Sequence, residues 1–411
     1  RVHGEASRES TRHAAAVMSA MTVSDTENGK DTTDDRFRTL HLLFTLGATP
    51  LTPIKGSRFY DICRVLLLLG SYLTPPLMIM GALHNLDDIP FIMEVARPLI
   101  AIFSVLWMHF FIRYKMQGVR DLLNIAKTFT WSDTPSSNRR TNAGLISRVQ
   151  RLALRTHITV AVSHTSYLIL RIVTKSNNTL FFNTWVPFDG ESNVAYVLIL
   201  IIQAFASWVY ILMLVGPLSL YSALVAACCT QLEKIQIGLL NVRQGEEDSA
   251  WAMKSRLAEC VKHHQKVFRF MVIMEDTFYV VLLGPFLSMA AGLCFTTYTI
   301  ITMAGNYAEI IQVFLVVFAM MAELLIFCWL GNELTEQSGQ VRKAAWSSNW
   351  VGAGVSLQRS LSIVMTVSKD FTLTAGKIIP VSRRTMLLVL NETYTYFMFL
   401  LNFVNKSSGD K

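Results

Sequence analysis

The sequence predicts an all-α polytopic membrane protein with seven transmembrane helices. Of its 411 residues, 52% are hydrophobic and only 16% are charged, and the mean hydropathy is +0.38, whereas a soluble domain carries about 25% charged residues. No Asp, Glu, Lys or Arg lies between Glu191 and Glu233, or between Asp276 and Glu309. Each of these runs exceeds the roughly 20 residues that one membrane crossing needs. Uncharged runs of this length indicate a chain that crosses a bilayer repeatedly.

Seven apolar segments give the expected spans in chain order. They cover residues 61–83, 90–111, 151–173, 193–229, 268–304, 308–330 and 385–403. Pro75 and Pro76 should kink the first span, and Pro98, Pro217 and Pro285 are candidates for kinks in others, because proline lacks the amide hydrogen of a helical residue. The fourth and fifth spans are longer than a bilayer is thick, so we expect one or both to tilt or to extend into the cytoplasm.

The distribution of basic residues orients the chain. The loops after the second, fourth and sixth spans are rich in Lys and Arg, whereas the loops at residues 84–89 and 305–307 contain neither. Short basic loops stay in the cytoplasm, so the amino terminus is predicted inside and the carboxyl terminus outside. The sequon at Asn177 falls in a loop assigned to the outer face, where it can be glycosylated.

The amino-terminal residues 1–36 differ from the rest of the chain. They are polar, charged and poor in aromatic residues, so we expect a disordered arm. Because the chain begins with Arg, part of this arm is a candidate non-native extension, with Met21 as a natural start.

Composition and motifs also exclude several functional classes. A net charge of +8 would suggest nucleic-acid binding in a soluble protein, but here the basic residues lie in loops between spans, so no nucleic-acid partner is expected. The sequence has no phosphate loop, HExxH or GxSxG motif, so we expect no enzyme activity, metal or cofactor. Seven spans with an internal amino terminus are the inverse of a G-protein-coupled receptor.

The last span carries a polar stripe. Asn391, Thr395, Phe399 and Asn402 follow one another at spacings of four, four and three residues and therefore share one face of a helix. Polar groups at membrane depth need a partner or water. Two interpretations are open at this point, packing against a neighbouring helix or the wall of a pore, and spacing alone favours packing.

From the fourth span onward, several motifs resemble those of the insect odorant receptor family. The motifs are Trp185-Val186-Pro187-Phe188-Asp189 with Tyr196 and Gln203, His263-His264 before Met274-Glu275-Asp276-Thr277-Phe278, Phe327-Cys328-Trp329-Leu330-Gly331-Asn332-Glu333-Leu334, Leu373-Thr374-Ala375-Gly376-Lys377, and Tyr394-Thr395-Tyr396-Phe397. The related gustatory receptors usually have Gln at the position of Asn402, and the other motifs favour the odorant branch. The family's co-receptor has a large insertion between its fourth and fifth spans. The corresponding loop, residues 230–266, is short here, so the chain resembles a ligand-tuning subunit.

The resemblance implies a ligand-gated cation channel in which four subunits surround a central pore. It also implies that the chain assembles with a co-receptor and contacts lipid. The complex would lie in the cell membrane, in dendrites of olfactory sensory neurons. It implies that Asn391, Thr395, Phe399 and Asn402 line the pore, with Phe399 at a hydrophobic gate. Residues 331–384 would form a cytoplasmic anchor between subunits, residues 385–404 the pore-lining helix, and residues 405–411 an extracellular tail. The candidate anchor residues are Trp329, Gly331, Asn332, Glu333, Trp346 and Trp350.

The implied ligand is a small volatile molecule, bound in the outer half of the region 37–330. Such a pocket is mostly apolar and aromatic, with one or two polar groups. The candidates are Phe91, Glu94, Val95, His164, Tyr167, Leu168, Arg171, Tyr196, Ile199, Gln203, Tyr307, Ile311 and Phe314. Ordinary core packing is the alternative for each aromatic residue, and Glu94 with Arg97 reads as a structural pair.

Two alternative functions stay open beside the odorant-gated channel. One is a gustatory-type channel for non-volatile ligands, and the other is an inverted seven-helix receptor that signals without conducting. Currents recorded with and without a co-receptor distinguish them.

Overall fold

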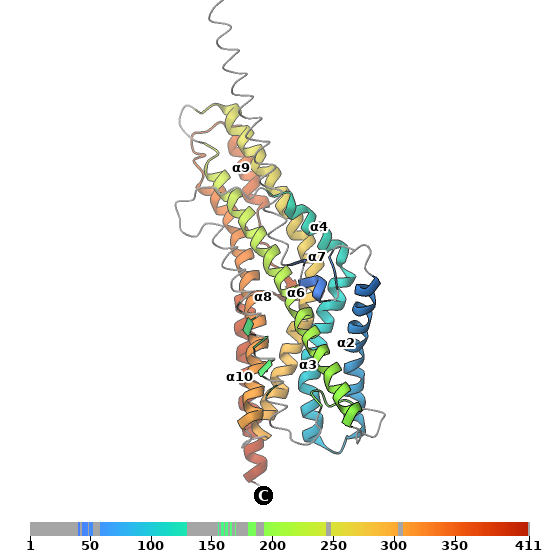
Figure 1. Cartoon of the computed structure of the whole chain (residues 1–411). Coiled ribbons are helices and arrows are strands. Elements are labelled where there is room, and N and C mark those ends of the chain that lie inside the picture. The colour runs from blue at the N-terminus through green and yellow to red at the C-terminus, as the bar shows by residue number, and fades with distance from the viewer. Residues whose placement is uncertain are drawn as a thin grey trace, which may run out of the picture.

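The chain folds into an elongated bundle of long helices, seen here in a computed structural model (Figure 1). The structure describes residues 40–129 except 42, 48 and 52–57, scattered helical positions between 155 and 169, and residues 180–185, 193–243, 248–302 and 307–409. In these ranges lie α2 Arg58–His84, α3 Ile89–Tyr114, α4 Met116–Lys127, α6 Asn193–Leu240, α7 Ala250–Thr302, α8 Tyr307–Ser347, α9 Val355–Val367 and α10 Arg383–Gly409. The expected arm at 1–36, most of the third span and Asn177 lie outside the described residues.

Within the described residues, four helices are long and apolar enough to cross a membrane. These segments are Arg58–His84, Phe91–Tyr114, Val197–Leu240 and Ala250–Gly292. The outward side of α2 carries Ile62, Leu66 and Leu69, each about 60% exposed in the isolated chain, and such a face suits lipid rather than water. The all-α class with membrane-spanning helices is therefore confirmed.

Three helices continue well beyond the length of a span. α6 has 48 residues, α7 has 53 and α8 has 41, against the roughly 20 residues that a bilayer requires. The expected fourth span therefore continues past residue 229 to Leu240, and α7 begins at Ala250 rather than at residue 268. The extensions are helical because their buried apolar residues recur at helical spacing, as in Leu232, Ile235 and Leu239 of α6.

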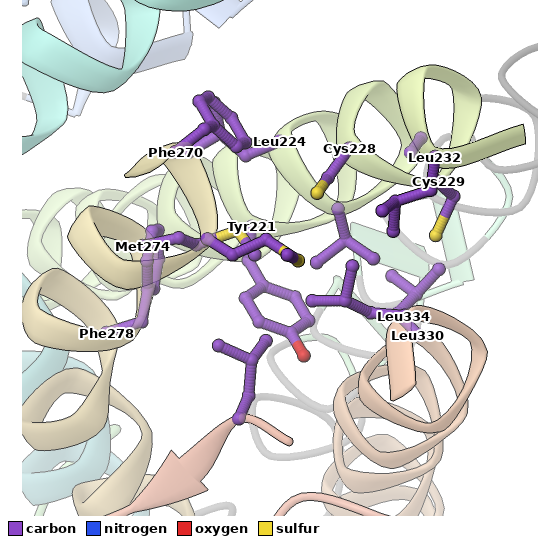
Figure 2. Packing of buried hydrophobic residues seen from close by; sticks show 14 of the residues in the cluster. Tyr221, Leu224, Cys228, Cys229, Leu232, Phe270, Met274, Phe278, Leu330 and Leu334 are labelled. Carbon is purple, nitrogen blue, oxygen red and sulfur yellow. The ribbon is translucent and has the colours of Figure 1, made fainter. Parts of the chain in front are cut away.

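The main hydrophobic core lies where α6, α7 and α8 meet. Figure 2 shows Tyr221 of α6 between Met274 and Phe278 of α7 and Leu330 and Leu334 of α8. The ring centroid of Tyr221 lies 5.6 Å from that of Phe278, and its hydroxyl donates a hydrogen bond of 3.2 Å to a backbone carbonyl of α8. A buried tyrosine needs such a partner for its hydroxyl group, so Tyr221 joins three helices with both its ring and its polar tip.

The short helix α4 continues the direction of α3 and packs along α7. Its buried residues Val119, Leu122 and Ala126 form one face. Immediately after α4, Phe129 contacts Phe270 of α7 with ring centroids 5.4 Å apart. Because α7 extends so far from the expected membrane region, it gives this amphipathic helix an apolar surface to cover.

The predicted kink residues lie inside continuous helices. Pro75 and Pro76 are within α2, Pro98 within α3, Pro217 within α6 and Pro285 within α7. None of these helices ends at its proline, and the kinks themselves stay a prediction.

A small hairpin connects α9 to the last helix. Strands β1 Thr374–Ala375 and β2 Ile379–Pro380 pair antiparallel, and α10 begins three residues after β2, at Arg383. α10 then runs beside α7 and α8 to the end of the bundle opposite α9 (Figure 1). The extracellular tail predicted at 405–411 begins inside this helix, because α10 continues through residue 405 to Gly409 with no proline to end it; its place outside the membrane stays a prediction.

Candidate functional site

The side of α10 that carries the polar stripe is not covered by the rest of the chain. Asn391 and Thr395 are exposed, and Phe399 is 64% exposed. The hydroxyl of Thr395 donates to the carbonyl of Asn391, one turn earlier in the same helix, at 3.0 Å. The stripe residues that the structure describes therefore make no side-chain packing layer against another helix of this chain. The side chain of Asn402 lies outside the described residues.

The start of α10, in contrast, is held firmly. The Ser382 hydroxyl accepts a hydrogen bond of 3.2 Å from the Thr385 amide, which caps the helix. The Arg383 guanidinium lies 4.0 Å from the Glu333 carboxylate of α8. A Cβ atom added to Gly331 of α8 would lie 2.6 Å from the Val381 carbonyl oxygen, so only glycine permits this close approach. The last helix is thus fixed at its first turn, while the described stripe residues further along it stay uncovered within the chain.

The predicted anchor residues fall into two groups. Trp329 packs partly buried against the main core, Gly331 is buried, and Glu333 accepts a hydrogen bond of 3.0 Å from the Gln337 side chain. Trp346 is 65% exposed and its carbonyl accepts the Trp350 indole N–H at 2.9 Å. Trp346 and Trp350 therefore form an aromatic pair in which Trp346 faces outward and Trp350 packs partly buried against the main core. Asn332 is half-buried on α8.

A second apolar cluster lies between α2, α3 and α6, toward the α2–α3 turn. It contains Met78, Val95, Ile102, Val105, Phe181, Phe182, Val209, Tyr210 and Met213, with Phe91 and Leu200 partly buried against it. Val95 and Phe91 were both predicted as pocket residues. Glu94 and Ile199 are half-buried on α3 and α6. The structure therefore places two of the predicted pocket residues in one apolar environment.

A short loop, residues 180–185, closes this second cluster. The buried side chain of Gln203 holds it: Nε2 donates to the Phe182 carbonyl at 3.1 Å and to the Thr184 hydroxyl at 3.0 Å, and Oε1 accepts from the Phe182 amide at 3.0 Å. All the polar atoms of Gln203 are thus bonded within the chain, although this residue was predicted to bind ligand. A Cβ on Gly81 of α2 would lie 3.1 Å from the Trp185 amide nitrogen, so glycine also lets the loop approach α2.

Three polar contacts between helices were not anticipated from the sequence. Tyr210 of α6 donates its hydroxyl to the carbonyl of Ser71 in α2, and this carbonyl has no helical partner because Pro75 lacks an amide hydrogen. Tyr72 bonds to Nδ1 of His109 on α3 at 2.9 Å. The Trp107 indole donates to a carbonyl of α7 at 2.8 Å. Only the first had a sequence signal, namely the proline four residues after Ser71.

Several predicted site residues lie outside the described residues or have undescribed side chains. They are His164, Tyr167, Leu168, Arg171, Tyr196, Tyr307, Ile311 and Phe314. In the described part of the chain, no three His, Cys, Asp or Glu side chains lie close enough together to hold a metal ion. Glu323 of α8 keeps one carboxylate oxygen buried without a hydrogen-bond partner.

The bundle of membrane-spanning helices, with an apolar cluster near one end and an uncovered last helix, defines a polytopic helical membrane protein. The sequence profile described as 7tm Odorant receptor matches residues 88–394. This match covers well over half of the chain, and the chain belongs to the odorant receptor family. The family and the fold are those of olfactory receptors and not of enzymes.

Individual relatives support the same assignment. Odorant receptor 33a of Drosophila melanogaster is 20% identical over 339 residues, which cover 82% of this chain and 86% of that protein. Odorant receptor 85b of the same fly is 24% identical over 308 residues, covering 71% and 77%. The solved structure of the insect olfactory receptor OR5 from Machilis hrabei superposes with a TM-score of 0.76 at 15% identity, covering 90% of this chain and 99% of that one.

A second structure of the Machilis hrabei receptor is a complex with eugenol. It superposes with a TM-score of 0.75 at 15% identity, covering 91% of this chain and 99% of that one. At this identity the likeness shows the fold, and the insect odorant receptor fold predicted from the sequence is thereby confirmed.

Proposed function

We propose that this chain is the odorant-binding subunit of a ligand-gated, non-selective cation channel that opens a central pore together with a co-receptor. The uncovered side of α10 carries this proposal. Asn391 and Thr395 are exposed beside Glu392 within a largely apolar stretch of this helix, residues 386–401, and hydrocarbon is a poor environment for polar side chains. If four such helices surround an axis, these side chains face water in the pore, and a ring of Phe399 side chains can close it by excluding water.

The ligand site in this proposal is the apolar cluster between α2, α3 and α6. Val95 is 1% exposed there and Phe91 packs at its border, which suits a small volatile molecule with one or two polar atoms. The related Machilis hrabei receptor was solved in complex with eugenol, an aromatic molecule of this kind. Eugenol is therefore a reasonable first probe for this chain.

The four-subunit assembly is supported by apolar residues of α9 and of the hairpin that nothing in the described chain covers. Ile363 and Val367 of α9 are 64% and 65% exposed, and Ile378 of the hairpin is 83% exposed. The basic loops predict that α9 and the hairpin lie on the cytoplasmic side, where exposed apolar residues in contact with water favour association. We place the contacts with the co-receptor and with further copies of the chain here, in a complex in the cell membrane of olfactory dendrites.

The test is current recording from cells that express this chain, the co-receptor, or both. Eugenol and a panel of other small volatile molecules are the probes. We expect odorant-evoked cation current only when both chains are present, together with altered permeation for Asn391→Ala and Asn402→Ala. Surface-expressed receptor that yields a second-messenger response without current would contradict a channel and favour a non-conducting receptor. Responses confined to non-volatile ligands would favour the gustatory-type alternative.

A further inference from the structure

The hairpin that precedes α10 is attached to one segment of α7. The Thr374 amide of β1 donates to the Glu275 carboxylate at 3.0 Å, and the Thr374 hydroxyl bonds to the other oxygen of the same group. One helical turn further along α7, the Tyr279 carbonyl accepts the Gly376 amide at 2.7 Å. A carboxylate that accepts from a backbone amide makes a strong, charge-assisted bond. The hairpin therefore follows α7, and α10 follows the hairpin.

The turn of this hairpin contains an unusual residue. Gly376 and Lys377 have φ angles of +65° and +59°, and the Ile378 amide closes the turn to the Ala375 carbonyl at 3.3 Å. Two successive positive φ angles are typical of a type I′ turn, whose second position is normally glycine. Lys377 is the one non-glycine residue with positive φ in the described part of the chain. A side chain in this strained conformation must be stabilised by a contact elsewhere.

Lys377 has such a contact on α7. Its ammonium nitrogen lies 4.6 Å from the centroid of the Tyr279 ring, which is within the range of a cation–π interaction. The ammonium of Lys115 lies 5.6 Å from the same centroid and 3.2 Å from the Asp276 carboxylate. Lys115 is the residue between α3 and α4. One aromatic ring thus contacts the end of α3 and the segment that leads into α10.

α3 also reaches the second apolar cluster. Val95, near the beginning of this helix, is buried there, while Lys115 follows its last residue. A shift of α3 along its axis would change the position of the Lys115 ammonium at Tyr279, because a close-packed interior transmits such a displacement along the helix. The ring is therefore placed where movement of the ligand-binding helix and the position of the pore helix can influence each other.

We propose that the Tyr279 ring links the end of α3 to the start of α10 through its contacts with Lys115 and Lys377. Lys377 is the positioning residue that keeps the start of α10 against α7. The effect on the pore rests on the proposed channel function, whereas the contacts at Tyr279 do not depend on it. Loss of either partner removes one of the contacts that hold the hairpin against α7 and lets α10 leave its resting position more readily. The positions of Lys377 and Tyr279 then set the balance between closed and open pore.

The structural part is tested by hydrogen–deuterium exchange on the full-length chain in lipid nanodiscs. The reporters are the amides of Thr374 and Gly376, both bonded to α7. We expect Lys377→Met and Tyr279→Leu to accelerate their exchange about two- to fivefold, as expected for loss of one exposed cation–π contact. Lys377→Arg and Tyr279→Phe keep the cation and the ring and should exchange like the wild type. Lys369→Met, which removes an exposed charge close to the hairpin, is the matched control.

The gating part is tested by the odorant-free current in cells that also express the co-receptor, normalised to receptor at the surface. We expect Lys377→Met to change this current while Lys377→Arg leaves it unaltered. Unchanged amide exchange in Lys377→Met would contradict the proposed link between the hairpin and α7. Faster exchange with unchanged current, when the wild type conducts, overturns its role in gating. If the wild type conducts under no condition, the channel proposal fails instead. Amide exchange then decides by itself whether Lys377 and Tyr279 link the hairpin to α7.

Discussion

Replacement of Gln203 by leucine should destabilise the folded chain, because this buried carboxamide satisfies three polar groups of the loop at residues 180–185. Both the amide and the carbonyl of Phe182 bond to Gln203, and Phe182 is buried, as is Gln203 at 4% exposure. A buried polar group left without its partner costs about 1–3 kcal/mol. Two such groups, with partial access of water after the change, give an expected loss of about 2–4 kcal/mol.

The assay is thermal unfolding of the purified full-length chain, followed by its intrinsic fluorescence. Gln203→Leu should lower the midpoint by several degrees, since about 1 kcal/mol corresponds to roughly 2–4 °C in chains of 150–250 residues and less in longer ones. Gln265→Leu, at an exposed position of α7, is the control for the change of residue type and should leave the midpoint nearly unaltered.

A double-mutant cycle sharpens this prediction. Thr184→Ala removes one hydrogen bond, of 3.0 Å, to the Gln203 side chain, so it should cost about 0.5–1.5 kcal/mol in the wild type and nearly nothing in Gln203→Leu. Equal midpoints for Gln203→Leu and Gln265→Leu would refute the reasoning. Reduced odorant sensitivity at unaltered stability would then indicate that Gln203 contacts the ligand directly, as its sequence position first suggested.

Three further predictions follow from the last third of the chain. Gly331→Ala should destabilise the fold by about 1–3 kcal/mol, because its Cβ would lie 2.6 Å from the Val381 carbonyl oxygen. Gly354→Ala, whose Cβ meets nothing within 4 Å, is the control. Equal unfolding midpoints for the two variants would contradict this prediction. Asn391→Ala should leave the unfolding midpoint unaltered, since the residue is exposed, but should change single-channel conductance or ion selectivity, and a normal conductance would count against its pore role. Ile363→Glu should reduce the fraction of receptor that migrates as a multi-subunit complex in native gels, and an unchanged complex would place the subunit contact elsewhere.

The sequence alone predicted the helical class and most of the spans. Long uncharged runs leave few alternatives to membrane helices, because backbone groups in lipid must be bonded within the helix. The polar stripe of Asn391, Thr395 and Phe399 was also evident from spacing. Its environment was not, since periodicity gives the face of a helix and does not say what covers that face. The structure leaves this face uncovered within the chain.

The lengths of α6, α7 and α8 were underestimated for a related reason. Hydropathy marks the part of a helix that suits lipid, but the extensions are held by residues such as Leu232 and Leu334, whose burial depends on neighbouring helices. The end of a membrane span and the end of its helix are therefore different positions. Local composition predicts the end of the span but not the end of the helix.

The roles of individual polar residues were decided by the tertiary structure. Gln203 looked like a ligand contact because it is a polar residue on an apolar span, yet a loop 18 or more residues away in the chain occupies its carboxamide. Lys377 looked like part of a family motif, and its ammonium contacts a ring of α7 nearly a hundred residues away. Local sequence determines which groups need a partner, since polar groups at depth are costly when unpaired. Which partner they find depends on contacts between distant segments, and these exist only in the folded chain.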